Sequence, residues 1–351
     1  MTDQAAHSGA VARAEGLCGV HRYTEAITLL TGALASQPDD ARTWCVLARA
    51  KLGAEDFQGA LDAAGRAVAL QPAKEWPHRL ASIAFTRLNQ FQQALSAALE
   101  SVRLSPMLWQ THARVAVASL NMHMLDQAER AAAKAVELAP LEPDTWTTLG
   151  SVALAHGDRS RAKDAYRRAL SLDAENVNAH DGLARVALKY GRWANPGGLA
   201  TAASGFAHSV RVDPRSATSR ANLEIVLRAF LSWFAYFVFI DAYFVSRVTV
   251  GSNNVGVRLL PLLLLAAPAI FAVKFLAGLT RVVRARLWQV LRHGLVSVAA
   301  ALELIAVLGI VVGFFVPGRA GIAIVATVSA GVGRLVLMLD LRRIRRRSAK
   351  R

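Results

Sequence analysis

The sequence predicts an all-α protein in which a domain of helical repeats precedes a set of long apolar helices. Two observations predict this class. Prolines recur with a period of about 34 residues through the first half of the chain, a period typical of stacked helical hairpins. Four stretches of about 20 mostly apolar residues occupy the second half, and each is long enough to cross a bilayer as a helix.

The positive charge of the chain is concentrated in its apolar half. The 351 residues carry a formal net charge of +16. Residues 1–224 contribute 24 Lys and Arg against 22 Asp and Glu, whereas residues 225–351 contribute 17 against 3. Cations that accompany apolar segments indicate a membrane surface. Nucleic-acid binding has little support, because no module that reads nucleic acid accompanies the charge.

The repeat is clearest in residues 144–174, "DTWTTLGSVALAHGDRSRAKDAYRRALSLDA". The prolines that set the period are Pro38, Pro72, Pro106 and Pro140, and the next slot is Ala174. The landmarks within this stretch are Trp146, Leu149, Gly150, Ala162, Tyr166 and Ala169. Small residues at one slot, such as Ala162, would let the two helices of a hairpin approach closely.

These landmarks resemble the tetratricopeptide repeat pattern of W-x-x-L-G, then A-x-x-x-F, then P. The departures are Ala153 where Tyr is usual and Ala174 where Pro is usual. The resemblance implies an α-solenoid of about six helical hairpins over residues 1–216, because one hairpin cannot bury its apolar face alone. The expected repeats are 7–40, 41–74, 75–108, 109–142, 143–176 and 177–216.

The resemblance also implies that the first helix of each repeat lines a concave groove that binds a protein or peptide. The family's groove positions fall here on Arg49, Trp76, Arg79, Arg87, Asn121, Arg185 and Lys189. A basic groove would suit an acidic segment or a terminal carboxylate, because the Arg guanidinium forks around carboxylates. The alternative is an ordinary solvated face, since Arg is the commonest cation throughout this chain.

The sequence predicts neither a catalytic site nor a metal or cofactor site. His78, His112 and His180 recur at the slot that Trp44 and Trp146 occupy. Successive repeats place this slot on helices roughly 10 Å apart, too far to share one ion, so we interpret these histidines as semi-polar rings filling an aromatic slot. The chain shows no HExxH, Walker or CxxC motif and no catalytic Ser/His/Asp spacing. We therefore predict a non-enzymatic protein.

Four transmembrane helices are predicted within residues 228–341, after a connecting helix at 217–227. Their ranges are 228–249, 259–279, 295–315 and 320–341. The loop at 280–293 and the tail at 342–351 are rich in Arg, and the positive-inside rule places both in the cytoplasm. An even number of spans and the lack of an export signal then place both termini there. Anionic lipid would be attracted by about 1 kcal/mol per charge.

Four ionisable residues fall inside the predicted spans: Asp241, Lys274, Glu303 and Arg334. Glu303 lies at a depth where it could pair with Lys274 or Arg334, although both cations could instead extend to the inner surface. Asp241 has no cation at its depth. It is therefore expected to be neutral, paired, or exposed to a wet cavity.

Together these features predict a membrane-tethered scaffold that captures a partner protein at the cytoplasmic face. The excess of Ala, and of Arg over Lys, is typical of GC-rich bacterial coding sequences, so we expect a bacterial inner membrane. The alternative is a small transporter or channel subunit regulated by its repeats, which Asp241, Glu303 and Pro268 would support.

Overall fold

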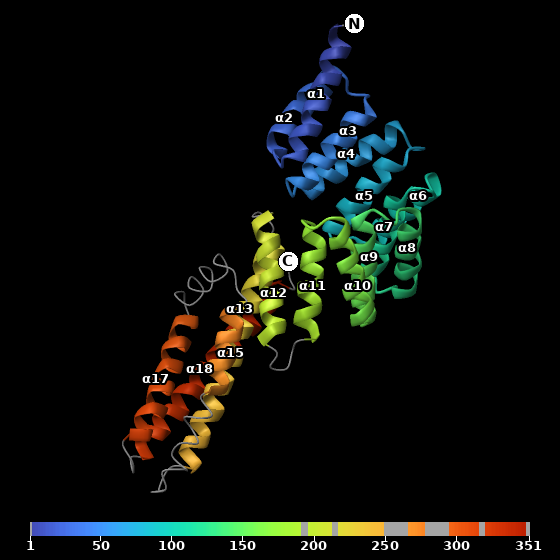
Figure 1. The fold of residues 1–351 in the computed structure, drawn as a ribbon. Coiled ribbons are helices and arrows are strands. Elements are labelled where there is room, and N and C mark those ends of the chain that lie inside the picture. Colours follow the sequence, from blue (N-terminus) through green and yellow to red (C-terminus); the bar gives the residue numbers. More distant parts are fainter. Residues whose placement is uncertain are drawn as a thin grey trace. The chain divides into compact units, whose positions relative to one another are not determined.

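The computed structural model describes residues 2–190, 196–212, 217–248, 266–277, 295–315 and 320–348 (Figure 1). Within these ranges the protein forms sixteen helices and no strand. The chain divides into two compact units, Met1–Ala174 and Glu175–Arg351. The division falls beside the junction of the predicted fifth and sixth repeats, and residue 216, the predicted end of the repeat domain, lies outside the described residues.

The first unit is a stack of five helical hairpins. Its helices are α1 (Thr2–Gly19), α2 (Tyr23–Ser36), α3 (Ala41–Gly53), α4 (Phe57–Leu70), α5 (Glu75–Arg87), α6 (Phe91–Leu104), α7 (Trp109–Asn121), α8 (Leu125–Leu138), α9 (Pro143–His156) and α10 (Arg159–Leu172). Each helix packs against the next, and each first helix also contacts the first helix of the following hairpin. The odd-numbered helices therefore form one continuous layer.

The turn inside every hairpin has the same backbone geometry. One residue per turn adopts a left-handed conformation, at His21, Glu55, Asn89, His123 and Gly157, with φ between 58° and 87°. The next N–H donates to the carbonyl five residues earlier, as from Asp158 to Ala153 at 3.0 Å, which is the Schellman helix ending. These five positions follow the same period as the prolines, so the repeat persists in the backbone even where the sequence pattern is weak.

In the second to fifth repeats, the ring at the aromatic slot donates a hydrogen bond to the carbonyl of the proline that precedes the repeat. The distance from the ring nitrogen to the proline oxygen is 2.7 Å for Trp44 and Pro38, 3.0 Å for His78 and Pro72, 2.7 Å for His112 and Pro106, and 2.8 Å for Trp146 and Pro140. Because a carbonyl can only accept, Nε2 carries the proton in both histidines. Histidine therefore replaces tryptophan here as a hydrogen-bond donor.

Small residues and one large ring build the core of the first unit. Ala60, Ala94, Ala128 and Ala162 share one slot and are at most 1% exposed. Tyr166 is fully buried, and a methyl group added to Gly150 would lie 2.8 Å from its ring. Glycine is therefore required at position 150 for the ring to pack so closely.

The second unit joins one further hairpin to the apolar helices. It contains α11 (Val177–Tyr190), α12 (Pro196–Val212), α13 (Ala217–Val248), α15 (Ala266–Ala277), α17 (Leu295–Phe315) and α18 (Ala320–Ser348). Helix α12 packs against α11, α13 and α15, while α13, α17 and α18 pack against one another. A single apolar cluster extends from Phe206 of α12 through Phe230 to Phe275 of α15. The Phe230 and Phe275 rings stack with centroids 3.8 Å apart.

One described helix is long and apolar enough to cross a membrane, at Arg220–Tyr243 within α13, and Val296–Leu308 is a shorter apolar segment. Helix α17 coincides with the predicted third span, and α18 extends past the end of the predicted fourth span to Ser348. The second span is described only in α15. Residues 259–265 and the basic loop at 280–293 lie outside the described residues, so the four spans stay a prediction.

Candidate partner-binding groove and buried polar residues

The predicted groove cations on α5 both have partners within the protein. Arg79 Nε lies 3.1 Å from Glu75 Oε2, and both side chains are largely buried. Arg87 is exposed and places its guanidinium 4.7 Å from the centre of the Phe57 ring. Trp76, at the start of α5, is half-buried against the core of the neighbouring repeat. A ligand of α5 would therefore meet a balanced ion pair beside an aromatic ring.

Acidic residues also accompany the cations at the N-terminal end of this layer. Arg42 Nη2 lies 3.3 Å from Glu15 of α1. Arg49 is exposed on α3 and interacts with the thiol of Cys18 on α1. Burial raises the pKa of Cys18, and Arg49 opposes that rise. The mixed charges make this layer less basic than the predicted groove positions alone suggest.

Helix α7 carries a cation that the sequence analysis missed. Desolvation lowers the pKa of Arg114, Arg79 lowers it further, and Asp144 of α9 opposes both. Arg114 thus lies between the first helices of three repeats. It was missed because it follows the family's groove position, which is Ala113. The available signal was that Arg114 is the only Lys, Arg, Asp or Glu in α7.

The same helix presents an acceptor that lacks a partner. The side-chain oxygen of Gln110 is buried and makes no hydrogen bond among the described residues. Gln110 occupies the repeat position that Trp76 and Asp144 occupy in the neighbouring repeats. An unpaired buried oxygen costs free energy unless a donor reaches it.

The remaining predicted groove residues are more scattered. Asn121 is half-buried at the end of α7. Arg185 is exposed on α11, which belongs to the second unit. Lys189 lies on the same helix, and its side chain is outside the described residues.

Two carboxyl groups are buried in the bundle of α13, α17 and α18. Asp241 is 2% exposed and Glu303 is 5% exposed, and neither makes a hydrogen bond among the described residues. Arg334 does not pair with Glu303. Its guanidinium lies 4.5 Å from the ring centre of Tyr236, so a cation–π contact replaces the predicted ion pair. Lys274 lies exposed on α15 and also makes no ion pair with Glu303 in the described part of the chain.

Two helices of this bundle are joined by an ion pair that was not predicted from the sequence. Arg228 of α13 donates to Asp340 of α18, and their side chains are 17% and 14% exposed. A signal existed in the composition, because residues 225–351 contain three acidic residues and Asp340 is one of them. Its partner could not be read from the sequence.

The comparisons with known proteins agree with the hairpin geometry. Residues 143–176 match the tetratricopeptide repeat family. They include the buried Tyr166, its neighbour Gly150, and the Trp146 hydrogen bond. The match covers one of the five hairpins of the first unit, and the other four have the same turn geometry as the matched hairpin. A search of curated proteins found no match.

Several solved structures resemble the fold at low sequence identity. The Cut9–Hcn1 structure gives a TM-score of 0.52 at 18% identity, over 63% of this chain and 42% of that chain. A thermophilic TPR protein of Thermus thermophilus gives 0.49 at 23%, over 52% and 99%. PilW, a type IV pilus biogenesis factor, gives 0.49 at 16%, over 63% and 98%. At these identities the likeness concerns the fold alone.

Proposed function

We propose that this protein is a membrane-tethered tetratricopeptide repeat scaffold that binds a partner protein or peptide along the odd-numbered helices of Met1–Ala174. The observation that carries the proposal is the continuous layer that the first helices form, in which α5 presents Trp76, Arg79 and Arg87. Trp76 beside Arg79 adds the aromatic and guanidinium groups that often dominate binding energy.

The charges of this layer favour a partner segment that contains an acidic residue. Arg49 adds positive charge beyond the two arginines that pair with Glu15 and Glu75, whereas Asp144 opposes the charge of Arg114. A carboxylate could also compete with Glu75 for Arg79, because the two atoms of that pair are separated by 3.1 Å and the fork of Arg accommodates two oxygens. We therefore expect moderate affinity that falls with salt.

Replacing Arg79 and Arg87 together with alanine should weaken partner capture by about tenfold and reduce its dependence on salt, since rim cations mainly steer association. The partner is first identified by crosslinking in cells and mass spectrometry. Its affinity for the full-length wild type and for the double variant is then measured at two salt concentrations. Circular dichroism should keep its helical signal while the Tm falls, because Arg79→Ala leaves the largely buried Glu75 without its counterion.

The matched control removes two arginines from second helices, as Arg66→Ala with Arg103→Ala. Both are exposed, on α4 and α6, and the loss of charge is the same. This control should bind normally. Equal capture by the Arg79/Arg87 variant at low salt would mean that the repeats bind through another face.

The proposed membrane tether is supported by the bundle of α13, α17 and α18, where large apolar side chains are exposed and small or polar side chains are buried. Large side chains on α17 and α18 face outward, including Leu304, Leu308, Val328 and Leu335, all more than half exposed. Buried positions hold alanines and the carboxyl groups of Asp241 and Glu303. Small and polar residues inside with apolar residues outside is the arrangement expected of helices surrounded by lipid.

With four spans, both termini should lie in the cytoplasm. Reporter fusions at residue 5 and residue 351 should both be active as cytoplasmic reporters and silent as periplasmic ones, because the basic loop and tail stay inside. Protease added from outside should cleave neither fusion. A single exposed terminus would mean an odd number of spans and would contradict the four-helix arrangement.

A transporter or channel subunit is the second candidate function. It is favoured by the two carboxyl groups buried without partners among the described residues, since such groups in a membrane often mark an ion path. Purified protein in proteoliposomes would then show ion or proton flux that Glu303→Gln abolishes. The scaffold proposal predicts no flux and unchanged partner binding in that variant.

A further inference from the structure

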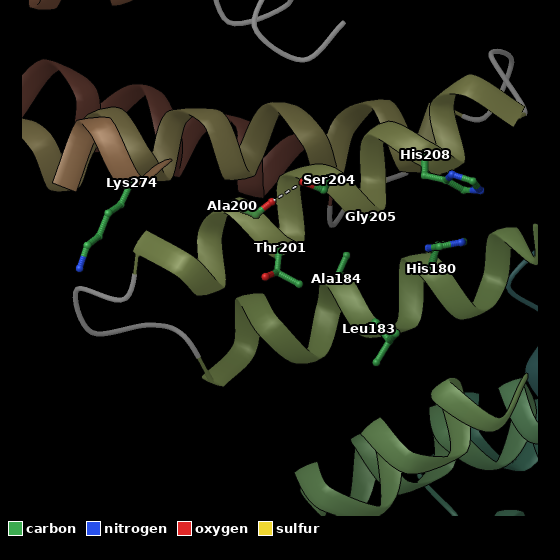
Figure 2. Close-up of a pocket in the computed structure, with 9 residues that line it drawn as sticks. All are labelled: His180, Leu183, Ala184, Ala200, Thr201, Ser204, Gly205, His208 and Lys274. Atoms are coloured by element: carbon green, nitrogen blue, oxygen red, sulfur yellow. Dashed lines mark hydrogen bonds between the residues drawn. The ribbon is translucent and has the colours of Figure 1, made fainter. Parts of the chain in front are cut away.

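A cavity of about 570 Å³ lies in the second unit between α11, α12 and α15 (Figure 2). Its polar groups lie at two ends. Lys274 of α15 borders one end, His180 and His208 border the other, and Thr201 lies between them. None of the described residues that line it is acidic. The cavity therefore offers a ligand one cation and several hydrogen-bonding groups.

The two histidines lie as a close pair of rings at one end of the cavity. Their ring centroids are 3.9 Å apart. Arg211 Nη2 donates to Nδ1 of His208 at 3.1 Å, so Nδ1 carries no proton. Burial lowers the pKa of His208 and His180 lowers it further, against the opposing effect of Glu175, 3.5 Å away. Lys274 is thus the cation that the cavity presents.

Lys274 is also the only charged residue of α15, an apolar helix that is buried on one side and exposed on the other. Phe275 is fully buried, whereas Ile270 is 54% exposed and Val273 is 65% exposed. Ile270 precedes Lys274 by one helical turn, so the two lie on the same stripe of α15. An exposed apolar surface therefore continues directly from the cation at the cavity.

A site with a cation, adjacent hydroxyl and imidazole groups, and a neighbouring apolar stripe complements an amphiphile with an anionic head. Basic pockets of this kind beside membrane helices recognise lipid headgroups. Lys also suits this place because its long stem can follow an apolar surface while its ammonium reaches polar groups.

We propose that the cavity binds the headgroup of an anionic phospholipid, whose phosphate contacts Lys274 and whose acyl chains lie along Ile270 and Val273. This inference rests on the proposed membrane insertion of the second unit. It gives the protein a lipid site built into the junction between its last hairpin and its apolar helices.

The test uses the full-length protein in a neutral detergent and three probes: dioctanoyl phosphatidylglycerol, dioctanoyl phosphatidylcholine and glycerol 3-phosphate. Calorimetry or native mass spectrometry should show one phosphatidylglycerol bound per chain, with phosphatidylcholine at least about tenfold weaker because it carries no net negative charge. Glycerol 3-phosphate should not bind at the same concentration, because it lacks the acyl chains.

Lys274→Gln should weaken phosphatidylglycerol by about tenfold and leave phosphatidylcholine unchanged, because only the charge contact is lost. Lys274→Arg should retain binding. Thr201→Leu, which narrows the cavity without changing charge, should weaken both lipids. Lys134→Gln, on the surface of the first unit, is the matched control and should behave as the wild type. Circular dichroism confirms that each variant is folded.

Equal binding of the two lipids, or unchanged phosphatidylglycerol binding by Lys274→Gln, would overturn the proposal. Competition by glycerol 3-phosphate alone would also overturn it, in favour of a soluble phosphate compound. Failure of membrane insertion is a different result. A full-length chain that stays monomeric in solution without detergent would contradict the tether while leaving one-to-one lipid binding measurable.

Discussion

Tyr166→Ala is expected to destabilise the first unit by about 3–5 kcal/mol, the usual cost of deleting a fully buried ring. Tyr166 is fully buried, its ring packs on Gly150, and its hydroxyl lies 3.1 Å from Ser151 Oγ. The ring joins the two helices of the fifth hairpin. Urea unfolding of a fragment of residues 1–174, followed by circular dichroism, measures the loss.

Tyr166→Phe is the matched control for this prediction. It keeps the ring and removes only the hydroxyl, so the expected loss is about 1 kcal/mol. Gly150→Ala should destabilise the wild-type fragment, because its methyl group would press on the ring, and should do so much less in Tyr166→Ala. A loss below about 1 kcal/mol for Tyr166→Ala would contradict the packing described, because a buried ring contributes more than that. A wild-type fragment that does not unfold cooperatively would contradict a self-contained first unit.

Removing either partner of the Arg228–Asp340 pair should also destabilise the protein. Arg228→Ala leaves the largely buried Asp340 without its counterion, a change that typically costs about 3–5 kcal/mol. Asp340→Ala should cost less, because Glu224 still lies 4.0 Å from Arg228. The pair joins α13 to α18 across 112 positions of sequence. Thermal unfolding of the full-length protein in detergent should show a marked fall in Tm for each single variant.

Replacing both residues with leucine should recover most of that loss, because a well-packed apolar pair avoids the desolvation of two charges. Arg220→Ala is the control, since Arg220 is exposed on the same helix, and its Tm should change little. If the double variant unfolds as early as the single ones, the pair is not what holds α13 against α18.

The repeat phase predicts on which helices the candidate groove residues lie, but it does not predict their charge partners. Repeat phase places Arg49, Trp76 and Arg79 on the first helices, because equivalent positions of successive repeats recur on the same face. Glu75 pairs with Arg79 one helical turn away, which the sequence could have revealed. The Arg42–Glu15 pair forms between two repeats, and so do the electrostatic interactions of Arg114 with Arg79 and Asp144. No local sequence pattern specifies contacts between repeats.

The sequence by itself determined the hairpins of the first unit. The constant spacing of the prolines, the small residues at one slot and the ring donors that follow each proline are local relations, and they persist whatever the distant chain does. Even the left-handed turn residues repeat, although four of the five are not glycine.

Only the tertiary structure decided how the remaining polar groups are satisfied. Arg334 contacts Tyr236 instead of Glu303, and Arg228 pairs with Asp340. The tertiary structure also decided that the apolar residues of α12 pack in one cluster with those of α15. Each choice depends on how two helices are rotated about their axes when they pack. Sequence spacing fixes which residues share a face of one helix, whereas the partner of that face is set by the best packing among all the helices, which buries apolar area at the least polar cost.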